Sequence, residues 1–496
     1  MSFDRTASFR RKLALAAAIV ALADALLFEV APGAGLAVFA AGVMVAVLIA
    51  LPPVRTSPLS RVALLAAGAF ALLQVERATP LGFLLFCVAM AISVLAPRAA
   101  RGGDAWRWAQ RVVWGGLLAV VGPFLDAALA LKARARRGRA LAMTQILIGA
   151  IVPVGGGLVF LSLFMSANPV LVRAVEAFDL PAPDIGRIVF WGVVGGAAWA
   201  LLRPRGLVRK VAWPKPAGRP GNPWVSPASV TASLVVFNAL FAVQNALDAA
   251  FLWSGAALPK GMTYADYAHR GAYPLIATAL LAGLFVLVFL RPVSETASRR
   301  WPRILVTAWV AQNLVLVAST AFRTWHYVEV YALTRLRIAA LIWMALVAVG
   351  LALICWRLLR NKSASWLINA NALAAGVVLA ACSVVDLGAI AAEWNVAHAA
   401  EVGGGGEKLD LCYLIQLRGD AVAPLAELER RSLPLDRRAE VASTRRGLMA
   451  QMSKTQMDWR SWRWRDARRL AKVRRLIGPE SPLGPETLDH GCYRGD

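Results

Sequence analysis

Four polar side chains lie within one long apolar run of the sequence: Asn238, Gln244, Asn245 and Asp248. Polar and ionisable groups are costly inside a membrane helix and therefore mark candidate sites of function. Gln244 and Asp248 are separated by one helical turn and share a face if the run is helical. Two interpretations stay open, because such groups either line a polar cavity or join one helix to another. In both, Asp248 needs a partner, for which Arg270 in the following loop is the candidate.

The segment after this run, Leu258–Gly271, is polar and rich in turn residues, and its sequence is LPKGMTYADYAHRG. Its proline and its first glycine predict a turn. Thr263 can then cap a short helix on which Tyr264 and Tyr267 share one face. We expect a small shaped element at a membrane boundary, with Thr263, Tyr264, Tyr267 and Arg270 as candidates for ligand contact.

A second polar patch has the sequence RTWHYVEVYALTRLR and extends from Arg323 to Arg337. If helical, it places Arg323, Tyr327 and Tyr331 on one face, with Arg335 one turn further. Guanidinium groups bind phosphate and carboxylate through paired hydrogen bonds. The patch is therefore either a receptor for an anionic group or an aromatic and basic anchor at the membrane interface. Its candidates for ligand contact are Arg323, Glu329, Tyr331, Arg335 and Arg337.

The sequence holds five cysteines and four histidines, and none of them has the spacing of a metal site. We therefore expect no metal and no other cofactor. Cys412 and Cys492 lie in the polar C-terminal part, where an oxidising compartment would allow them to form a disulfide. The glycine clusters at 155–157 and 195–196 lie inside apolar runs and lack the context of a phosphate loop, which argues against nucleotide binding. No motif supports an enzyme, and a non-enzymatic role is favoured.

The composition indicates which elements must position these groups. Of 496 residues, 58% are hydrophobic and 17% are charged, whereas about a quarter of a soluble domain is charged. The formal net charge of +25 would by itself suggest nucleic acid. However, residues 1–385 contain 36 basic and 13 acidic residues, against 18 and 16 in residues 386–496. The basic excess lies in loops between apolar runs, as the positive-inside rule describes. We expect membrane lipids, and no nucleic acid, as partners.

The apolar runs predict an all-α fold, a polytopic transmembrane bundle of about eleven spans (about ten to twelve) with a small helical C-terminal domain. The runs are Leu13–Ala31, Ala34–Leu51, Val62–Val75, Pro80–Ala96, Ala140–Met165, Gly186–Leu202, Ala228–Trp253, Ala272–Leu290, Ile304–Phe322, Ile338–Trp356 and Leu367–Val385. Val112–Leu131 stands apart, because Gly122-Pro123 interrupts it and basic clusters flank both sides. An interfacial helix or a re-entrant hairpin would keep both clusters inside.

Three regions follow from these runs: an N-terminal membrane region at 1–139, a core membrane domain at 140–385 and a C-terminal helical domain at 386–496. With the N-terminus in the cytoplasm, the basic loops fall inside and the C-terminal domain falls in the periplasm. Within that domain, Leu411–Arg431 and Arg437–Met457 have helical composition. Gln456–Ile477 predicts an amphipathic basic helix that either lies on a membrane surface or covers the domain.

Several segments occur in a recognisable order. FNALFAVQNALDAAFLWSG precedes LPKGMTYADYAHRG, and YALTRLRIAALIWMALVAVGLALI, WNVAHA and LDLCYLIQLRGDAVAPL follow. From Ser166 to the C-terminal domain, this series resembles an uncharacterised family of bacterial multi-spanning inner-membrane proteins, a domain of unknown function that carries the motif LPxGxTYAxYxxRG. The resemblance implies a multi-spanning inner-membrane protein of unassigned activity. His269 departs from the motif, which leads us to expect arginine there. Matching positions in the later segments include Asn395, Asp410, Tyr413, Leu414 and Asp420.

We expect an integral protein of the bacterial inner membrane that senses or handles an envelope ligand, with Leu258–Gly271 and Arg323–Arg337 forming its outer mouth. The first alternative is a transporter of a small or lipidic anion with Asp248 on the path, although the inverted repeats of many transporters are not visible. The second is a membrane-embedded transferase, for which Asp248, Asp266 and Glu329 are the available acids. An envelope signalling or transport component is the expected partner, and the oligomeric state stays open.

Overall fold

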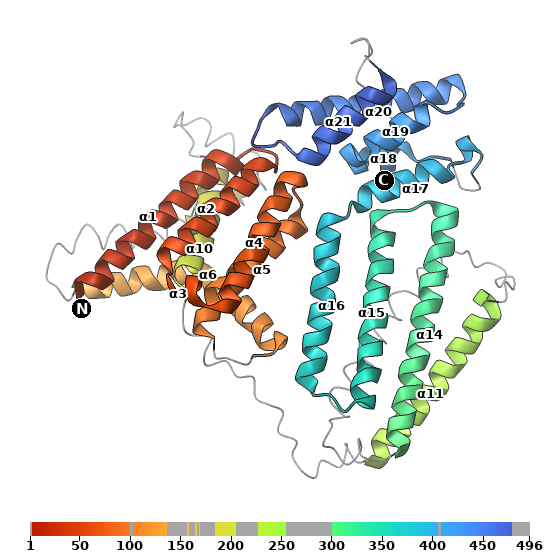
Figure 1. Cartoon of the computed structure of the whole chain (residues 1–496), viewed down its shortest axis with the longest axis horizontal. Coiled ribbons are helices and arrows are strands. Elements are labelled where there is room, and N and C mark those ends of the chain that lie inside the picture. Colours follow the sequence, from red (N-terminus) through yellow and green to blue (C-terminus); the bar gives the residue numbers. More distant parts are fainter. Residues whose placement is uncertain are drawn as a thin grey trace. The chain divides into compact units, whose positions relative to one another are not determined.

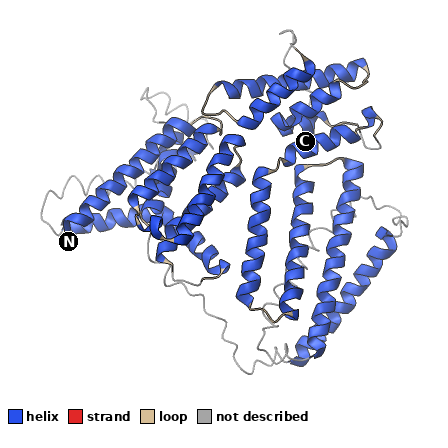
Figure 2. Ribbon diagram, viewed as in Figure 1, coloured by secondary structure: helices blue, strands red, loops and turns tan. Residues whose placement is uncertain are grey.

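The computed structural model describes residues 2–99, 103–135, 156–157, 164–165, 168, 184–204, 227–253, 300–404 and 408–478. All regular elements in these residues are helices, and none is a strand (Figures 1 and 2). Seven of the described helices are long and apolar enough to cross a membrane. The predicted all-α transmembrane class is therefore confirmed. The total of about eleven spans stays a prediction.

The membrane-length helices coincide with predicted spans, and their bounds are Pro58–Glu76, Pro80–Arg98, Ile185–Leu202, Ala228–Asp248, Arg300–Tyr331, Arg335–Leu359 and Ala364–Val384. Ala34–Ala50 is a shorter apolar helix. The predicted spans Ala140–Met165 and Ala272–Leu290 lie largely or wholly outside the described residues, and so does the polar segment Leu258–Gly271.

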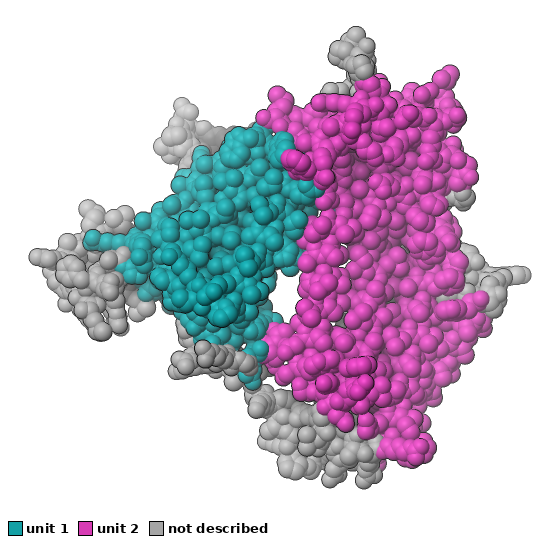
Figure 3. All heavy atoms as spheres, viewed as in Figure 1, with its two compact units in different colours: residues 1–103, 107–212, 458–463 teal, residues 104–106, 213–457, 464–496 magenta. Residues whose placement is uncertain are grey.

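The chain divides into two compact units, which are coloured separately in Figure 3. The N-terminal unit contains residues 1–103, 107–212 and 458–463, and the C-terminal unit contains residues 104–106, 213–457 and 464–496. These units differ from the predicted regions at 1–139, 140–385 and 386–496, whose boundaries stay predictions.

The N-terminal unit is built on α1 (Ser2–Leu27), α2 (Ala34–Ala50), α4 (Pro58–Glu76), α5 (Pro80–Leu95) and α10 (Ile185–Leu202). Helix α2 packs on α1 and α4, and α10 packs on α1. Its core is rich in alanine, and small side chains let helix backbones approach closely where lipid surrounds them. Ser57 and Thr79 cap α4 and α5 with their hydroxyl groups, and each helix has proline in its first turn.

Helix α6 (Ala105–Ala135) settles one of the open alternatives. It is one helix of 31 residues with Pro123 inside it, so a re-entrant hairpin at Val112–Leu131 is wrong. A proline in a helix interior removes one hydrogen bond and often bends the helix, but it does not have to end it. The interfacial helix stays a prediction.

The C-terminal unit places α11 (Pro227–Asp248) and its π-helical extension η4 (Ala249–Trp253) beside α14 (Arg300–Tyr331). Helices α15 (Arg335–Leu359) and α16 (Ala364–Val384) follow α14 as neighbours joined by short turns (Figure 1). Their N-caps are Thr334 and Ser363.

A helical domain formed by residues 386–457 and 464–478 continues from α16. Its helices, with their bounds, are α17 (Leu387–His398), α18 (Leu411–Leu417), α19 (Val422–Glu429), α20 (Leu435–Met457) and α21 (Trp464–Ile477). Leu470 and Val473 of α21 are buried in a core that also contains Val328 of α14 and Leu333. Helix α21 therefore covers the domain, which is one of the two predicted alternatives. We call this part the tail domain.

Part of the tail prediction is wrong. The predicted helix Gln456–Ile477 begins only at Trp464, because residues 458–463 form a turn in which the Asp458 carboxylate accepts the Arg460 backbone N–H at 2.9 Å. This turn belongs to the N-terminal unit, where the carbonyls of Arg460 and Trp462 accept the N–H groups of Gly35 and Ala34 at 2.8 and 2.9 Å. It thereby satisfies donors at the start of α2 that a helix leaves unpaired.

Candidate functional site

A row of polar side chains joins α11 to α14. Asn238 Nδ2 donates to the carbonyl of Leu305 at 2.9 Å, and Asn245 Nδ2 donates to the carbonyl of Gln312 at 3.2 Å. Gln312 Nε2 in turn donates to Asn238 Oδ1 at 2.8 Å. We call Asn238, Asn245, Asp248, Gln312 and Arg323 the polar seam. Amides that bridge membrane helices in this way stabilise their association.

The two helices run parallel. Asn238 contacts Leu305 and Asn245 contacts Gln312, both 67 residues further along the chain. Trp253 Nε1 donates to Ser319 Oγ at 3.1 Å, 66 residues further. Because the number of residues between contacting positions is nearly constant, both helices run in the same direction.

Asp248 forms a buried ion pair with Arg323. The Asp248 side chain is 1% exposed and that of Arg323 is 6% exposed. Asp248 Oδ1 accepts from Arg323 Nη2 and also from Gln244 Nε2, the latter at 3.0 Å. The structure thus gives Asp248 a partner in α14, whereas the suggested partner Arg270 lies outside the described residues. Buried carboxylates are usually paired in this manner.

The end of α14 carries an aromatic and acidic cluster. Glu329 accepts from Trp325 Nε1 at 2.9 Å, and its second oxygen lies 3.0 Å from His326 Nδ1. The ring of Trp325 meets that of Trp394 of α17 edge to face at 5.3 Å. His398 stacks on Trp394 with 3.8 Å between the ring centroids. These contacts join the end of a membrane-length helix to the tail domain.

Arg337, one of the predicted ligand contacts of this patch, makes its contacts inside the protein. Helix α14 ends at Tyr331, and Ala332 takes a left-handed conformation with a φ of 66°. Arg335 therefore does not follow Tyr331 on the same helical face, and this part of the prediction is wrong. Arg337 donates to the carbonyls of Tyr331, at 2.5 Å, and of Ala332, and its guanidinium lies 4.3 Å from the ring centroid of Tyr327. Arg337 thus stabilises the turn between α14 and α15.

Arg335 connects the first turn of α15 to the tail domain. Its side chain forms an ion pair with Asp420, and its backbone N–H donates to the Tyr413 hydroxyl at 2.8 Å. Burial raises the pKa of Tyr413, and the hydrogen bond from Arg335 opposes that effect. Asp420 also binds Arg469 at 2.9 Å, and Arg469 binds Asp386, the N-cap of α17. We call Arg335, Asp386, Asp420 and Arg469 the docking network.

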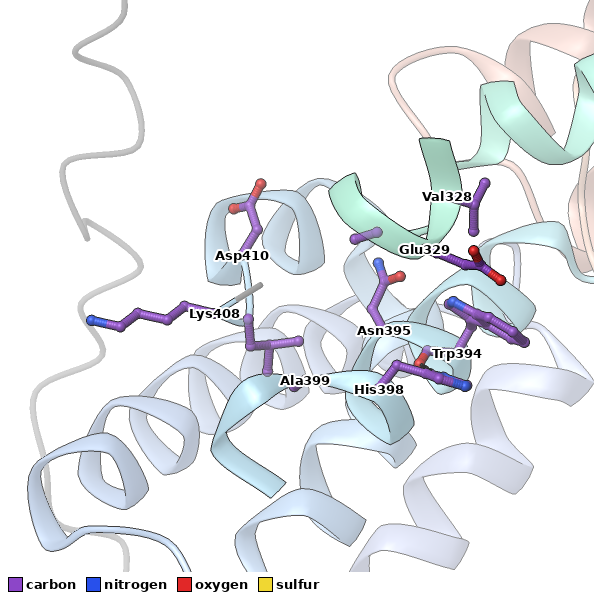
Figure 4. A pocket seen from close by; sticks show the side chains of 10 residues that line it. Val328, Glu329, Trp394, Asn395, His398, Ala399, Lys408 and Asp410 are labelled. Carbon is purple, nitrogen blue, oxygen red and sulfur yellow. Dashed lines mark hydrogen bonds between the residues drawn. The ribbon is translucent and has the colours of Figure 1, made fainter. Parts of the chain in front are cut away.

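A pocket of about 210 Å³ lies where α14 meets the tail domain. Its walls are Val328, Glu329, Ala332, Trp394, Asn395, His398, Ala399, Lys408, Leu409 and Asp410. Figure 4 shows Glu329, Trp394 and His398 gathered on one side, with Lys408 extending on the other. The pocket therefore offers the Glu329 carboxylate beside an aromatic and aliphatic wall, whereas the ammonium group of Lys408 points away from it. It is smaller than the pockets that take drug-sized ligands, which measure about 300–1,000 Å³.

Two contacts hold the pocket walls in place. Asn395 is buried, and it donates to the carbonyl of Leu333 at 3.0 Å while accepting the Leu333 N–H at 2.7 Å. Glu401 accepts the Leu409 N–H at 3.1 Å and binds Arg437 at 2.5 Å. Burial raises the pKa of Glu401, but these hydrogen bonds outweigh it and hold the pKa below its usual value. These contacts fix the walls, and in the second of them Glu401 and Arg437 do so from outside the pocket lining.

The predicted site residues other than Cys412 fall into four groups. Asn238, Gln244, Asp248 and Arg323 come together between α11 and α14, whereas Glu329 lines the pocket. Tyr331, Arg335 and Arg337 lie at the turn between α14 and α15. Thr263, Tyr264, Tyr267, Arg270 and Cys492 lie outside the described residues.

Cys412 takes part in a disulfide. Since Cys492 is not among the described residues, the predicted pairing of these two cysteines stays a prediction.

Sequence reasoning missed the residues that the tail domain supplies. Trp394, His398 and Lys408 line the pocket, and Asp386 and Arg469 belong to the docking network. One signal was present in the sequence, because Asn395, Tyr413 and Asp420 were among the positions on which the predicted resemblance rested. In the described residues, no group of three or more His, Cys, Asp or Glu side chains is arranged to hold a metal ion.

Seven membrane-length helices, a polar seam between two of them and a helical domain at the end of α14 and α16 define a polytopic α-helical membrane protein. The family described as a domain of unknown function (DUF4153) matches residues 43–428, which is more than half of the chain. The chain belongs to this DUF4153 family. No curated protein and no solved structure matches it significantly. The resemblance to an uncharacterised domain family is confirmed at this level.

Proposed function

We propose that this chain is a non-enzymatic receptor module of a bacterial inner membrane, which binds a small envelope ligand at the pocket between α14 and the tail domain. One observation carries the proposal. The pocket takes Val328, Glu329 and Ala332 from the end of a membrane-length helix and its other walls from the tail domain. An occupant would contact both parts at once, so its binding energy would depend on how the tail domain is held against the membrane helix.

The charge distribution supports a periplasmic tail domain. In the C-terminal unit, Arg300 and Arg303 lie at the start of α14, and Arg357, Arg360 and Lys362 lie at or after the end of α15. The tail domain lies at the opposite ends of these helices (Figure 1). Because basic loops tend to stay in the cytoplasm, this arrangement supports a tail domain on the outer side. The disulfide at Cys412 agrees with an oxidising compartment.

The N-terminal unit independently supports the same membrane orientation. At one end, burial and the positive charges of Arg98, Arg203 and Arg11 hold the pKa of Lys12 below its usual value, so these four cations lie close together. The turn at 458–463 contacts the other end, at Ala25 and at the start of α2. If the basic end of the N-terminal unit is cytoplasmic, the chain around residue 460 lies on the periplasmic side, which supports the same orientation.

Cysteine accessibility tests this topology. In a variant without its native cysteines, we expect Arg446→Cys in the tail domain to react with a membrane-impermeant maleimide in spheroplasts. Lys362→Cys at the opposite end should react only after lysis, and both side chains are exposed. If only Lys362→Cys is labelled before lysis, the orientation is the opposite of the proposed one.

Pocket variants test the receptor. In cells that lack the chromosomal copy, we expect Glu329→Ala and His398→Ala to behave like the empty vector in survival under envelope stress, at a normal protein level. Glu393→Ala is the matched control, because Glu393 is exposed on the same helix as His398 but does not line the pocket. Wild-type survival of both pocket variants at normal protein levels would refute the receptor role.

A transporter is the second candidate, and the polar seam favours it. Asn238 and Trp253 mark the two ends of the contact along α11 and η4, a length of roughly 22 Å at the rise of a helix. Polar groups over most of the thickness of a bilayer suit a path as well as a helix contact. Flux of a small anion into proteoliposomes that Asp248→Asn abolishes would favour transport over the receptor. The membrane-embedded transferase has no comparable support, since Asp248 is bound to Arg323.

A further inference from the structure

Basic side chains gather at one end of the N-terminal unit. Lys12 lies near the start of α1, Arg98 ends the short 3-10 helix that extends α5, and Arg203 directly follows α10. Four residues from each of them lies a member of one buried core, and these members are Ala16, Val94 and Trp199. Because residues four apart lie one above the other on a helix, the three cations lie just beyond the same end of this core.

Ring contacts bring Arg203 to the face of α1 that carries Lys12. The Arg203 guanidinium lies 5.5 Å from the ring centroid of Phe9 and 5.9 Å from that of Trp199. The two rings meet edge to face at 5.5 Å. Phe9 precedes Lys12 by three residues, so the two side chains are neighbours on the helix surface. Arg203 and Lys12 are therefore held on the same side of α1.

The charges at this end of the unit are not balanced. Burial, and then the positive charges of Arg98, Arg203 and Arg11, lower the pKa of Lys12. Asp126 binds Arg203 at 3.3 Å. In the part of the chain that the structure describes, Arg11, Lys12 and Arg98 form no ion pair with an acid. Like charges that lie this close repel one another, so a bound anion would stabilise their arrangement. We call Arg11, Lys12, Arg98 and Arg203 the cationic cluster.

We propose that the cationic cluster binds the phosphate group of an anionic lipid. Guanidinium groups bind phosphate through paired hydrogen bonds, and an ammonium group adds a point charge. The cluster lies at the ends of the membrane-length helices that contain α5 and α10, and basic pockets between such helices bind lipid head groups. Arg11 and Arg98 are exposed, and the Arg203 side chain is 39% exposed. A head group can therefore reach the cluster without opening the core.

Membrane orientation alone does not explain this arrangement. The positive-inside rule calls for basic residues in loops, but it does not require them to converge. Arg55 and Arg61 of the same unit show the contrast, because each binds a backbone carbonyl. Arg55 Nε donates to the carbonyl of Leu48, and Arg61 Nε donates to that of Arg55, both at 3.0 Å. The lipid site depends neither on the receptor role nor on which side of the membrane the cluster faces.

Thermal unfolding of the purified full-length protein in a neutral detergent tests the site. Phosphatidylglycerol is the probe. Phosphatidylcholine, which has a phosphate but no net charge, and inorganic phosphate are tested in parallel. We expect phosphatidylglycerol alone to raise the midpoint in a saturable manner, on the order of 5 °C at a hundredfold excess over the dissociation constant. Lys12→Gln with Arg98→Gln should raise this dissociation constant about 25-fold, at about fivefold for each basic side chain.

Arg55→Gln with Arg61→Gln is the matched control, because it removes the same number of charges from the same unit. It should keep the wild-type dissociation constant. Arg11→Gln changes one exposed side chain and should raise the constant about fivefold, which keeps the test valid if the double variant of the cluster does not fold.

An equal loss of affinity in both double variants would overturn the proposal, because diffuse attraction by the net charge predicts that result. An equal rise of the midpoint with phosphatidylcholine would overturn it as well. An equal rise with inorganic phosphate would overturn the assignment to a lipid and make the cluster a site for free phosphate.

Discussion

Arg323→Leu should lower the free energy of unfolding of the C-terminal unit by about 3–5 kcal/mol, because it leaves Asp248 as a buried carboxylate without its cation. The two side chains are 6% and 1% exposed, so water cannot take the place of the guanidinium. The measurement is the unfolding of the purified protein, by heat and by denaturant. The expected loss is large compared with the whole stability of a domain, which is about 5–15 kcal/mol.

The double variant Asp248→Leu with Arg323→Leu gives this prediction its sharpest form. Replacing both members of a buried pair by apolar side chains is often neutral or stabilising, so the double variant should recover most of the loss. Lys472→Leu is the control for an exposed pair. Lys472 and Glu427 are 49% and 45% exposed and 2.7 Å apart, and such a pair contributes about 0–1 kcal/mol. A double variant as unstable as the single one would show that Asp248 is not held mainly by Arg323.

Gly388→Val should detach the tail domain from α15. The Cβ of any larger residue at 388 would overlap Asp420 Oδ2 and the Arg335 guanidinium, whose Nε would lie only 2.7 Å away. Neither group can move without giving up its partner in the docking network. We expect a loss of about 1–3 kcal/mol, mainly from overpacking, because the Arg335 side chain of the disrupted ion pair is 43% exposed.

Limited proteolysis of membranes measures this effect as the rate at which the tail domain is cleaved. Gly376→Val is the matched control, because a Cβ at Gly376 of α16 meets no atom within 4 Å. It should be cleaved at the wild-type rate. Equal cleavage of Gly388→Val and wild type would mean that the docking network does not hold the tail domain.

The two predictions differ in what they report. The first concerns the packing of membrane-length helices against each other, and the second concerns the attachment of a helical domain to their ends. Both act on helices α14 and α15, which the turn at Ala332 joins. The two variants therefore act on the same connected helix pair, and each can be tested without the other.

The seam shows how far the sequence leads. Asn238, Gln244 and Asp248 stand out because polar side chains in an apolar run are rare and must be satisfied. The helical period places them near one another without further information. Their partners are different, because Gln312 and Arg323 lie 74 and 75 residues further along the chain. Periodicity decides which residues share a face of one helix, but not which two helices pack.

The pocket and the docking network could not be predicted from the sequence for the same reason. Glu329 belongs to α14, whereas Trp394 and His398 belong to α17, and short-range patterns carry no information about that approach. Arg335 shows a second limit. Its helical face was predicted from a pattern that continues through Ala332, but the left-handed backbone there ends α14. The preference of one residue for a rare conformation depends on its surroundings more than on its type.

The sequence by itself determined the membrane class, the helical class and the ends of the helices at which basic residues gather, since these depend on composition and on local period. Only the tertiary structure decided that Arg323 rather than Arg270 is the described partner of Asp248, that Arg335 holds the tail domain, and that a pocket lies at the end of α14. Each of these depends on contacts between segments far apart in the chain. Such contacts are selected by the packing of whole helices, and not by the local preferences that a sequence pattern records.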